Sequence, residues 1–211
     1  MSDPDRAAHW QSVYATKAET EVSWFQDHPD VSLELVRRSV ACPGSPIIDV
    51  GAGAARLADA LLEDGFTDVT VLDIAPAAFI RTRERLGPRA AALRFVAADI
   101  TRWQPDRVHD VWHDRAVFHF LTEAADRAAY RAVLGAALRP GGIAILGTFA
   151  PDGPPRCSGL PVMRYAPDAL AAELGAGFVL LDSLNHAHHT PGGAVQHFQF
   201  SRFRRPGLTP G

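Results

Sequence analysis

The chain has 211 residues, 47% of them hydrophobic, and a formal net charge of −3 at pH 7. This length and apolar content are enough for one sizeable core, and no apolar run reaches the roughly 18–20 residues of a membrane-spanning helix. The acidic balance argues against nucleic-acid binding, two cysteines are too few for a disulfide framework, and the first residues lack the features of a signal peptide. We therefore expect a single cytoplasmic domain over residues 1–211, without nucleic-acid or membrane partners.

The first 45 residues carry aromatic side chains but no strand pattern. Trp10, Tyr14, Trp24 and Phe25 form a dense aromatic group, and a helix is predicted over Val31–Val40. This segment is interpreted either as a lid over a ligand site or as an extra helix packed on a sheet, and the two interpretations are compatible.

Apolar runs of strand length then alternate with helical stretches, which indicates a mostly parallel sheet covered by helices on both faces. The clearest helix is Glu123–Leu138, whose apolar residues share one face. Phe178–Leu184 and Val195–Phe203, joined by TPGG, predict an antiparallel hairpin that completes the sheet. The predicted parallel strands are Ile47–Val50, Val69–Asp73, Leu93–Ala97, Val108–His113 and Ile143–Phe149.

The stretch IIDVGAGAAR, which follows the first predicted helix, almost matches the dinucleotide fingerprint G-x-G-x-x-G. Gly51 and Gly53 fit it, but Arg56 stands at the third glycine, and the Asp49 carboxylate would repel a nearby pyrophosphate. Glycines at this turn allow a ligand to approach the backbone closely. An acidic residue beside them suits a cofactor that carries positive charge, so a nicotinamide oxidoreductase is disfavoured.

Here the chain resembles the class I S-adenosylmethionine-dependent methyltransferases, whose first motif is IIDVGAG-like. VTVLDIAP places Asp73 after the second strand, where the family binds the ribose, and RFVAADI places Asp99 and Ile100 where it holds the adenine. LRPGGIAILGTF matches the family's turn into the fifth strand. The resemblance implies S-adenosylmethionine as cofactor and a Rossmann-like seven-stranded sheet whose last strand is antiparallel. The cofactor-binding candidates are Asp49, Gly51, Ala52, Gly53, Arg56, Asp73, Ile74, Asp99, Ile100 and Asp114.

The resemblance divides the domain into an N-terminal helical lid over 1–45, a cofactor-binding core over 46–150, and an acceptor loop, helix and hairpin over 151–211. Asp114, His113 and His119 follow the fourth strand, the position that faces the transferring methyl in this family, and are the catalytic candidates. Alternatively, Asp114 caps a turn or pairs with Arg115, and His119 packs among its apolar neighbours. The substrate-binding candidates are Tyr14, Trp24, Phe118, Arg164 and Tyr165, and Cys157 is a candidate lining residue.

The C-terminal hairpin is rich in histidine. His186 and His188 are expected to share one face of a strand while His189 points to the other, with His197 on the second strand. No cysteine or close carboxylate pair assists them, so we predict no metal site and interpret these residues as pocket-lining or solvated.

The predicted function is transfer of a methyl group from S-adenosylmethionine to a small-molecule acceptor. Protein lysine is the alternative, because SWF and DRAVFHFL distantly resemble lysine methyltransferases of the superfamily; of their Asp-Lys-Gly-Thr motif, however, only Asp114 is kept. A second alternative is a non-catalytic, cofactor-binding partner protein. Either a monomer or a homodimer fits the sequence.

Overall fold

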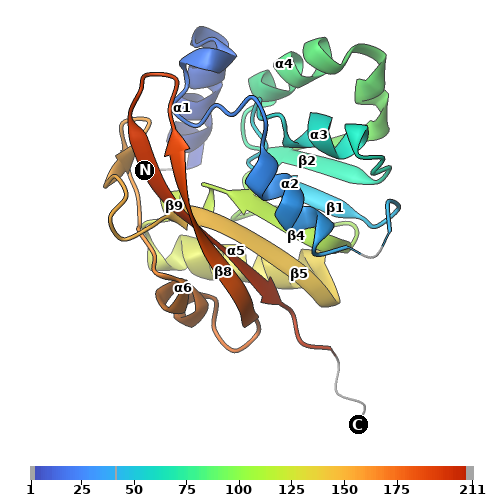
Figure 1. Cartoon of the computed structure of the whole chain (residues 1–211), viewed down its shortest axis with the longest axis vertical. Helices are drawn as coiled ribbons and strands as arrows, with labels where there is room; N and C mark the ends of the chain where they lie inside the picture. The colour runs from blue at the N-terminus through green and yellow to red at the C-terminus, as the bar shows by residue number, and fades with distance from the viewer. Residues whose placement is uncertain (1–2, 41, 208–211) are drawn as a thin grey trace.

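The computed structural model describes residues 3–40 and 42–207. Its centre is a seven-stranded sheet in the order β3-β2-β1-β4-β5-β9-β8, in which the first five strands of that order are parallel and β9 is antiparallel to both its neighbours (Figure 1). The strands are β1 Ile47–Val50, β2 Val69–Asp73, β3 Leu93–Ala97, β4 His109–Arg115, β5 Leu138–Phe149, β8 Val179–His189 and β9 Val195–Arg204.

Helices cover both faces of the sheet (Figure 1). One face packs against α2 (Asp30–Arg37), α3 (Leu57–Glu63) and α4 (Pro76–Leu86). The other packs against α5 (Ala124–Ala137) and α6 (Pro167–Leu174). The central strands are buried on both faces because parallel strands are joined by crossover helices, which explains why β1 and β2 are apolar runs without alternation.

The N-terminal segment lies across the carboxyl ends of the parallel strands. α1 (Asp3–Thr16) packs against α4, and the short 3-10 helix η1 (Glu19–Glu21) follows it. Trp24 lies edge-on to both Trp10 and Tyr14, so these three residues of the aromatic group form one cluster. The remaining short elements are the 3-10 helices η2 Gly87–Ala92 and η3 Phe118–Phe120 and the two-residue strands β6 Arg156–Cys157 and β7 Leu160–Pro161.

The predicted fold class is confirmed. Several element bounds differ, among them the end of β4, which runs to Arg115 rather than His113. α2 ends at Arg37 rather than Val40. β5 begins at Leu138 rather than Ile143, because Leu138 pairs with His109 of β4, and Gly141 and Gly142 of the RPGG turn are hydrogen-bonded to Arg205. β8 runs to His189, beyond the predicted Leu184, because it pairs with β9 along its whole length. Cross-strand pairing extends these strands past the residues that show an apolar pattern. Among the described residues, no helix is long and apolar enough to cross a membrane.

Gly147 allows β5 and β9 to pack closely. It is paired with Phe200, whose Cε1 would lie 2.6 Å from a Cβ added at position 147. Phe200 is buried and its ring has no room to retreat. We expect Gly147→Ala to lower the free energy of unfolding by about 1–3 kcal/mol, the usual cost of overpacking a core. Urea denaturation of the variant measures this loss.

Gly44→Ala is the matched control, because a Cβ there meets no atom within 4 Å. It should change stability by less than about 0.5 kcal/mol, as surface substitutions usually do. Equal stability of the Gly147→Ala variant and the wild type would show that the β5–β9 interface adapts freely.

Candidate cofactor and acceptor site

A two-lobed cleft lies at the carboxyl ends of β1, β2 and β4, beneath the N-terminal segment. The first lobe, of about 710 Å³, is lined by Asp49, Ala52, Arg56 and His113 among others. The second lobe, of about 820 Å³, includes Asp73, Ile74, Asp99, Ile100, Trp10, Phe120, Cys157, Gln196 and Phe198. The two lobes adjoin each other, because Tyr14, Trp24, Gly51 and Arg115 line both of them.

The turn after β1 requires glycine at two positions. Gly51 and Gly53 have φ of 63° and 55°, a conformation that other residues rarely adopt. A Cβ at Gly51 would lie 2.0 Å from Val117 Cγ2, and one at Gly53 would lie 2.3 Å from the Tyr14 hydroxyl oxygen. Backbone conformation and close packing therefore explain both glycines of the motif.

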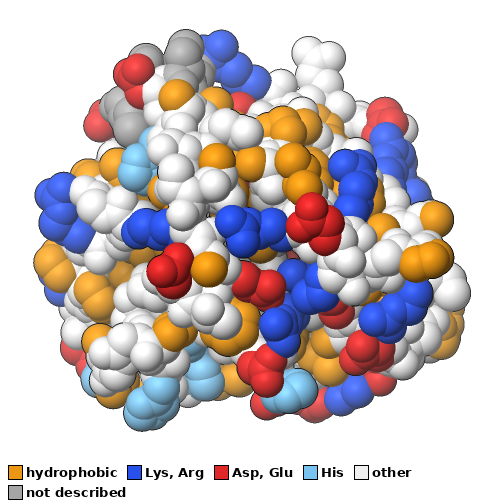
Figure 2. Space-filling view, turned by 90° about the horizontal axis from the view of Figure 1, so that it is seen from above, with side chains coloured by type: hydrophobic (Ala, Val, Ile, Leu, Met, Phe, Trp, Pro, Cys, Tyr) orange, Lys and Arg blue, Asp and Glu red, His pale blue; other side chains and the backbone are white. Residues whose placement is uncertain are grey.

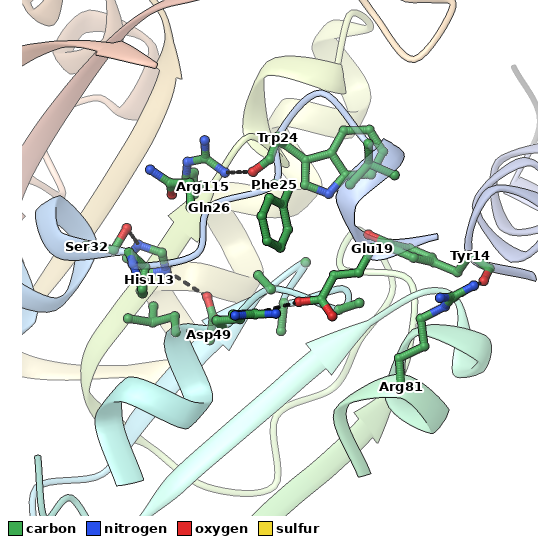
Figure 3. Close-up of a pocket in the computed structure, with 18 of the residues that line it drawn as sticks. Tyr14, Glu19, Trp24, Phe25, Gln26, Ser32, Asp49, Arg81, His113 and Arg115 are labelled. Atoms are coloured by element: carbon green, nitrogen blue, oxygen red, sulfur yellow. Dashed lines mark hydrogen bonds and ion pairs between the residues drawn. The ribbon is translucent and has the colours of Figure 1, made fainter. Parts of the chain in front are cut away.

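Asp49 is held by a buried hydrogen-bonded chain in the wall of the first lobe (Figure 3). Its Oδ1 lies 2.7 Å from Nδ1 of His113, and the other ring nitrogen of His113 lies 2.9 Å from the Ser32 hydroxyl. Asp49 and His113 are register partners on β1 and β4, and Ser32 comes from α2. This arrangement fixes the orientation of the carboxylate, and it places His113 beside Asp49 rather than at an open position in the cleft.

Asp73 ends β2, and its carboxylate is bound by backbone N–H groups on both sides. Gly53 N donates to Oδ2 at 2.9 Å and Ala75 N donates to Oδ1 at 2.8 Å. The side chain is buried, which raises its pKa to about 6 despite these hydrogen bonds. Asp73 thereby ties the glycine turn to β2 and presents a carboxylate to the second lobe.

Asp99 lies at the far end of the second lobe, between apolar side chains. Its Oδ1 accepts hydrogen bonds from the backbone and hydroxyl of Thr101. Its Oδ2 is buried, accepts no hydrogen bond, and lies 3.8 Å from Nη1 of Arg6. Ile74 and Ile100 line the same lobe. This end of the cleft combines an unsatisfied acceptor atom with flat apolar walls.

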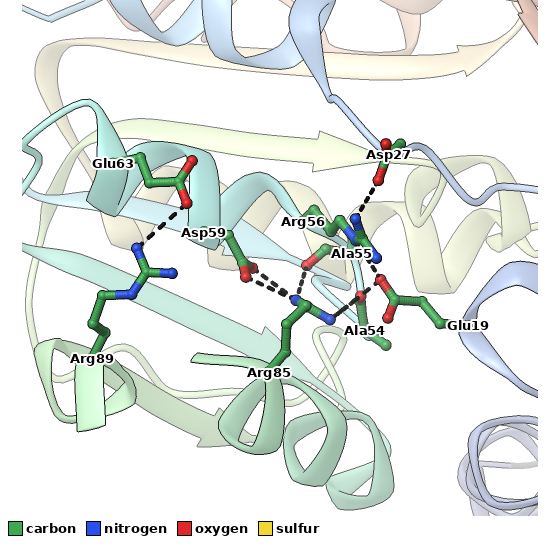
Figure 4. Close-up of polar contacts among 9 residues, drawn as sticks. All are labelled: Glu19, Asp27, Ala54, Ala55, Arg56, Asp59, Glu63, Arg85 and Arg89. Atoms are coloured by element: carbon green, nitrogen blue, oxygen red, sulfur yellow. Dashed lines mark hydrogen bonds and ion pairs between the residues drawn. The ribbon is translucent and has the colours of Figure 1, made fainter. Parts of the chain in front are cut away.

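Arg56 fastens the N-terminal segment to the glycine turn (Figure 4). It donates to Glu19 at 2.8 Å and pairs with Asp27. Arg85 also reaches Glu19, at 3.3 Å, and holds Asp59 with two hydrogen bonds. The Arg56 guanidinium is therefore occupied by protein carboxylates, although the residue lines the first lobe.

Aromatic side chains from the N-terminal segment and from η3 enclose the second lobe. Trp10 lies edge-on to both Trp24 and Phe120, with ring centroids 5.8 Å and 5.1 Å apart. Tyr14 is buried against Gly53. These rings form an aromatic wall of the second lobe.

Residues 47–142 match the family model described as a methyltransferase domain. Residues 47–142 therefore carry a methyltransferase domain, and their glycine turn and strand-end carboxylates support its assignment to the class I S-adenosylmethionine-dependent methyltransferases. The glycine motif and the acidic residues Asp73 and Asp99 fall within the matched residues, which end at Gly142, inside the LRPGGIAILGTF motif.

Solved structures with this fold include several methyltransferases. A protein studied in the conversion of a disulfide bond into a thioacetal group during echinomycin biosynthesis has a TM-score of 0.74, 22% identity, and coverage of 96% of this chain and 94% of that one. The Burkholderia thailandensis 1,6-didemethyltoxoflavin-N1-methyltransferase has a TM-score of 0.69, 22% identity, and coverage of 98% and 91%. The glycopeptide N-methyltransferase MtfA has a TM-score of 0.67, 19% identity, and coverage of 88% and 97%.

A curated relative is the mouse (Mus musculus) eEF1A lysine and N-terminal methyltransferase. It is 22% identical over 128 residues, which are 60% of this chain and 18% of the mouse protein. The chain thus spans less than a fifth of the length of that relative.

The structure places Asp114 of the methyltransferase domain in the core and not in the cleft. Its side chain is fully buried, and neither lobe includes it. Oδ1 accepts from Val117 N, and Oδ2 accepts from Phe118 N and, at 2.5 Å, from the Tyr130 hydroxyl. Burial raises the pKa of Asp114 to about 6. The geometry therefore favours the alternative interpretation, in which Asp114 caps the turn after β4.

Several other sequence candidates also lie outside the cleft. His119 is buried between Phe120 and Phe149, and burial together with the Arg115 charge lowers its pKa to about 3, so it is neutral. Phe118 packs on Tyr130 in the core. Arg164 is exposed and donates to the Gly153 carbonyl, and Tyr165 is buried against Phe118. Tyr14 and Trp24 do line both lobes.

The histidines of the hairpin are distributed as the strand geometry predicts. His188 is buried and hydrogen-bonded to the Ser23 carbonyl at 2.7 Å, whereas His189 is exposed. His197 pairs with Asp152 at 2.6 Å. Among residues 3–40 and 42–207, no three His, Cys, Asp or Glu side chains are grouped as metal ligands.

Arg115, Phe120, Gln196 and Phe198 were not among the sequence candidates, yet all four line the second lobe. Phe198 and Gln196 come from β9, which is distant in sequence from the motifs. The sequence offered one indication of Arg115. Neighbouring residues of a strand point to opposite faces, so an Asp114 that faces the core places Arg115 on the other face.

Removing the Tyr130 hydroxyl should destabilise the protein through Asp114. Tyr130→Phe leaves a buried carboxylate oxygen without its hydroxyl donor, and the Trp112 indole N–H loses its acceptor. We expect a loss of about 1–3 kcal/mol in the free energy of unfolding, measured by urea denaturation.

The matched control is Tyr165→Phe, because the buried Tyr165 hydroxyl has no hydrogen-bond partner. That variant should be as stable as the wild type or more stable, since it removes an unpaired polar group. The prediction for Tyr130→Phe would be contradicted by equal stability of the two variants.

Proposed function

We propose that this methyltransferase binds S-adenosylmethionine across both lobes and transfers its methyl group to a small-molecule acceptor in the second lobe. The observation that carries the choice of acceptor is the aromatic enclosure. Trp10 lies edge-on to Trp24 and to Phe120, and all three line the second lobe, so the acceptor space has aromatic walls. A space walled by aromatic rings suits a compact acceptor, whereas a lysine on a protein surface requires an open channel.

The residues at the far end of the second lobe fit the adenosine part of this cofactor. The unsatisfied Asp99 Oδ2 is an acceptor for an adenine amino group, and Ile74 and Ile100 supply apolar surface for the ring. The Asp73 carboxylate would accept from the ribose hydroxyls. Asp49, with its orientation fixed by His113, would face the positively charged amino-acid part of the cofactor in the first lobe.

The cofactor, when bound, supplies an electrophilic methyl group, and the protein positions the acceptor and excludes water. The aromatic lid supplies the exclusion. Neither Asp114 nor His119 is placed to remove a proton, since both are buried outside the cleft. The proposed function therefore depends on positioning, with the acceptor proton released to solvent or to a group on the acceptor.

Protein lysine is the second candidate acceptor, supported by the similarity to the mouse lysine and N-terminal methyltransferase over 60% of this chain. Surface charge does not favour it. Figure 2 shows acidic and basic side chains interspersed over the face it presents, with no acidic patch for a lysine-bearing peptide among the described residues there.

The acceptor class can be tested with S-adenosylmethionine carrying a labelled methyl group. The enzyme is incubated with the small-molecule fraction or the protein fraction of a cell extract, and the label in each is measured. Label in the small-molecule fraction supports the proposal, and label confined to lysines of digested protein overturns it. Asp73→Asn serves as the background control.

If label appears in neither fraction although S-adenosylhomocysteine binds, the non-catalytic interpretation is favoured and the proposed transfer fails. Titration calorimetry with S-adenosylhomocysteine and NAD in parallel establishes binding. Binding of NAD alone would contradict the assigned cofactor.

Binding of S-adenosylhomocysteine should weaken at acid pH. The pKa of Asp73 is raised from 3.8 to about 6, so the carboxyl gains a proton as the pH falls through that value. Because the charged form is the better acceptor for ribose hydroxyls, the Kd should rise by up to about tenfold per pH unit below about pH 6. Titrations from about pH 7 to about pH 5 measure this slope.

Asp73→Asn is the matched variant for the pH series as well. It should bind more weakly and without the pH dependence, because the asparagine amide does not titrate in this range. The ribose role of Asp73 would be overturned by a wild-type Kd that stays constant, or by an unaltered slope in the variant.

A further inference from the structure

Arg115 is the last residue of β4 and lines both lobes of the cleft. Its Nη1 donates to the Trp24 carbonyl at 2.9 Å (Figure 3). Its Nε and Nη2 are shielded from solvent and have no hydrogen-bond partner. Within residues 3–40 and 42–207, no carboxylate lies within ion-pair distance of this guanidinium. A buried cation with unpaired donors is costly unless a ligand satisfies them.

The groups around Arg115 do not provide a directly paired counterion. Burial raises the pKa of the Cys157 thiol, so no thiolate forms at neutral pH. Burial and the Arg115 charge lower the pKa values of His186 and His188, so both are neutral. The Asp49 carboxylate attracts the Arg115 charge without a direct contact, and its own hydrogen bond is with His113. Burial lowers the pKa of Arg115 only to about 10, and the side chain remains a cation.

The position of Arg115 is fixed by the turn that follows it. Ala116 has φ of 76°, an unusual value for a residue other than glycine, and its N–H donates to the Gly147 carbonyl at 2.8 Å. Asp114 accepts from the next two backbone N–H groups. The buried Asp114 therefore acts as a positioning residue that holds the turn carrying Arg115.

Arg115 points away from the adenosine end of the cleft. Its guanidinium carbon lies 4.8 Å from the centre of the Phe198 ring on β9. Phe198, Gln196 and Cys157 line the second lobe beside it, and the Gln196 Oε1 is a second buried polar atom without a partner. This wall belongs to the C-terminal hairpin and the loop after β5, which follow the matched methyltransferase residues 47–142.

We propose that Arg115 binds an anionic group of the acceptor, a carboxylate or a phosphate, within the aromatic second lobe, so that the substrate class is small aromatic or apolar acids. This rests on the proposed small-molecule function. The Nε and Nη2 atoms supply two donors for two oxygens of such a group. The Gln196 amide lies in the same wall and is available to a hydroxyl or amino group of the same molecule.

The proposal is tested with 4-hydroxybenzoate, 4-aminobenzoate and phenyl phosphate, and with the carboxamides of the two acids as neutral counterparts. Each is titrated into the enzyme saturated with S-adenosylhomocysteine. We expect the carboxylates to bind at least about tenfold more tightly than the carboxamides, which is the effect of one charge-assisted pair. Comparison with phenyl phosphate distinguishes a carboxylate site from a phosphate site.

Arg115→Gln should abolish this preference and leave the Kd of S-adenosylhomocysteine within about threefold of the wild type, whereas Arg115→Lys should keep part of the preference. Arg139→Gln is the charge-matched control, since Arg139 is exposed and pairs with Asp110 outside the cleft. Thermal melting identifies any variant that does not fold. If Arg115→Gln does not fold, the preference of Arg115→Lys for carboxylates over carboxamides tests the proposal instead.

Two outcomes would overturn the inference. Equal binding of carboxylates and carboxamides by the wild type would exclude an anionic acceptor. The proposed small-molecule function would still stand in that case if label is transferred to neutral small molecules. A loss of S-adenosylhomocysteine affinity in Arg115→Gln as large as the loss of carboxylate affinity would assign Arg115 to the cofactor's own carboxylate. Transfer of label to protein alone would instead overturn the underlying function.

Discussion

The register between β1 and β4 is the constraint on which the site depends. It places Asp49 beside His113 and Val50 beside Asp114, so that two neighbouring strands end at the same level. The glycine turn after β1 and the turn after β4 then meet face to face, with Val117 against Gly51. Because the carboxyl ends of parallel strands lie along one edge of a sheet, the cleft forms at this junction.

Alternation of side chains along β4 assigns three consecutive residues to three different tasks. His113 and Arg115 point to one face of the sheet, where His113 contacts Asp49 of β1 and Ser32 of α2, and Arg115 donates to the Trp24 carbonyl. Asp114 points to the opposite face and is bound by Tyr130 of α5. A carboxylate that is satisfied by three donors in the core stabilises the turn, while the arginine beside it remains available to a ligand.

The N-terminal segment is attached to the cleft by charge and by aromatic packing. Glu19 is paired both with Arg56, which follows the glycine turn, and with Arg85 of α4. Tyr14 and Trp24 then cover the two lobes. Arg56 pairs with the carboxylates of Glu19 and Asp27. These pairs explain why an arginine can follow the glycine motif without contacting a ligand.

The sequence by itself determined the fold class and the edge of the sheet at which most of the cofactor-binding candidates lie, because glycine at positive φ and acidic residues at strand ends are local features that parallel β-sheets bring to one edge. It did not determine which side of β4 faces the cleft, so Asp114 was expected there and Arg115 was not. Phe198 and Gln196 reach the second lobe only through the antiparallel pairing of β5 with β9. Contacts between residues far apart in sequence depend on tertiary packing, which a local pattern does not encode.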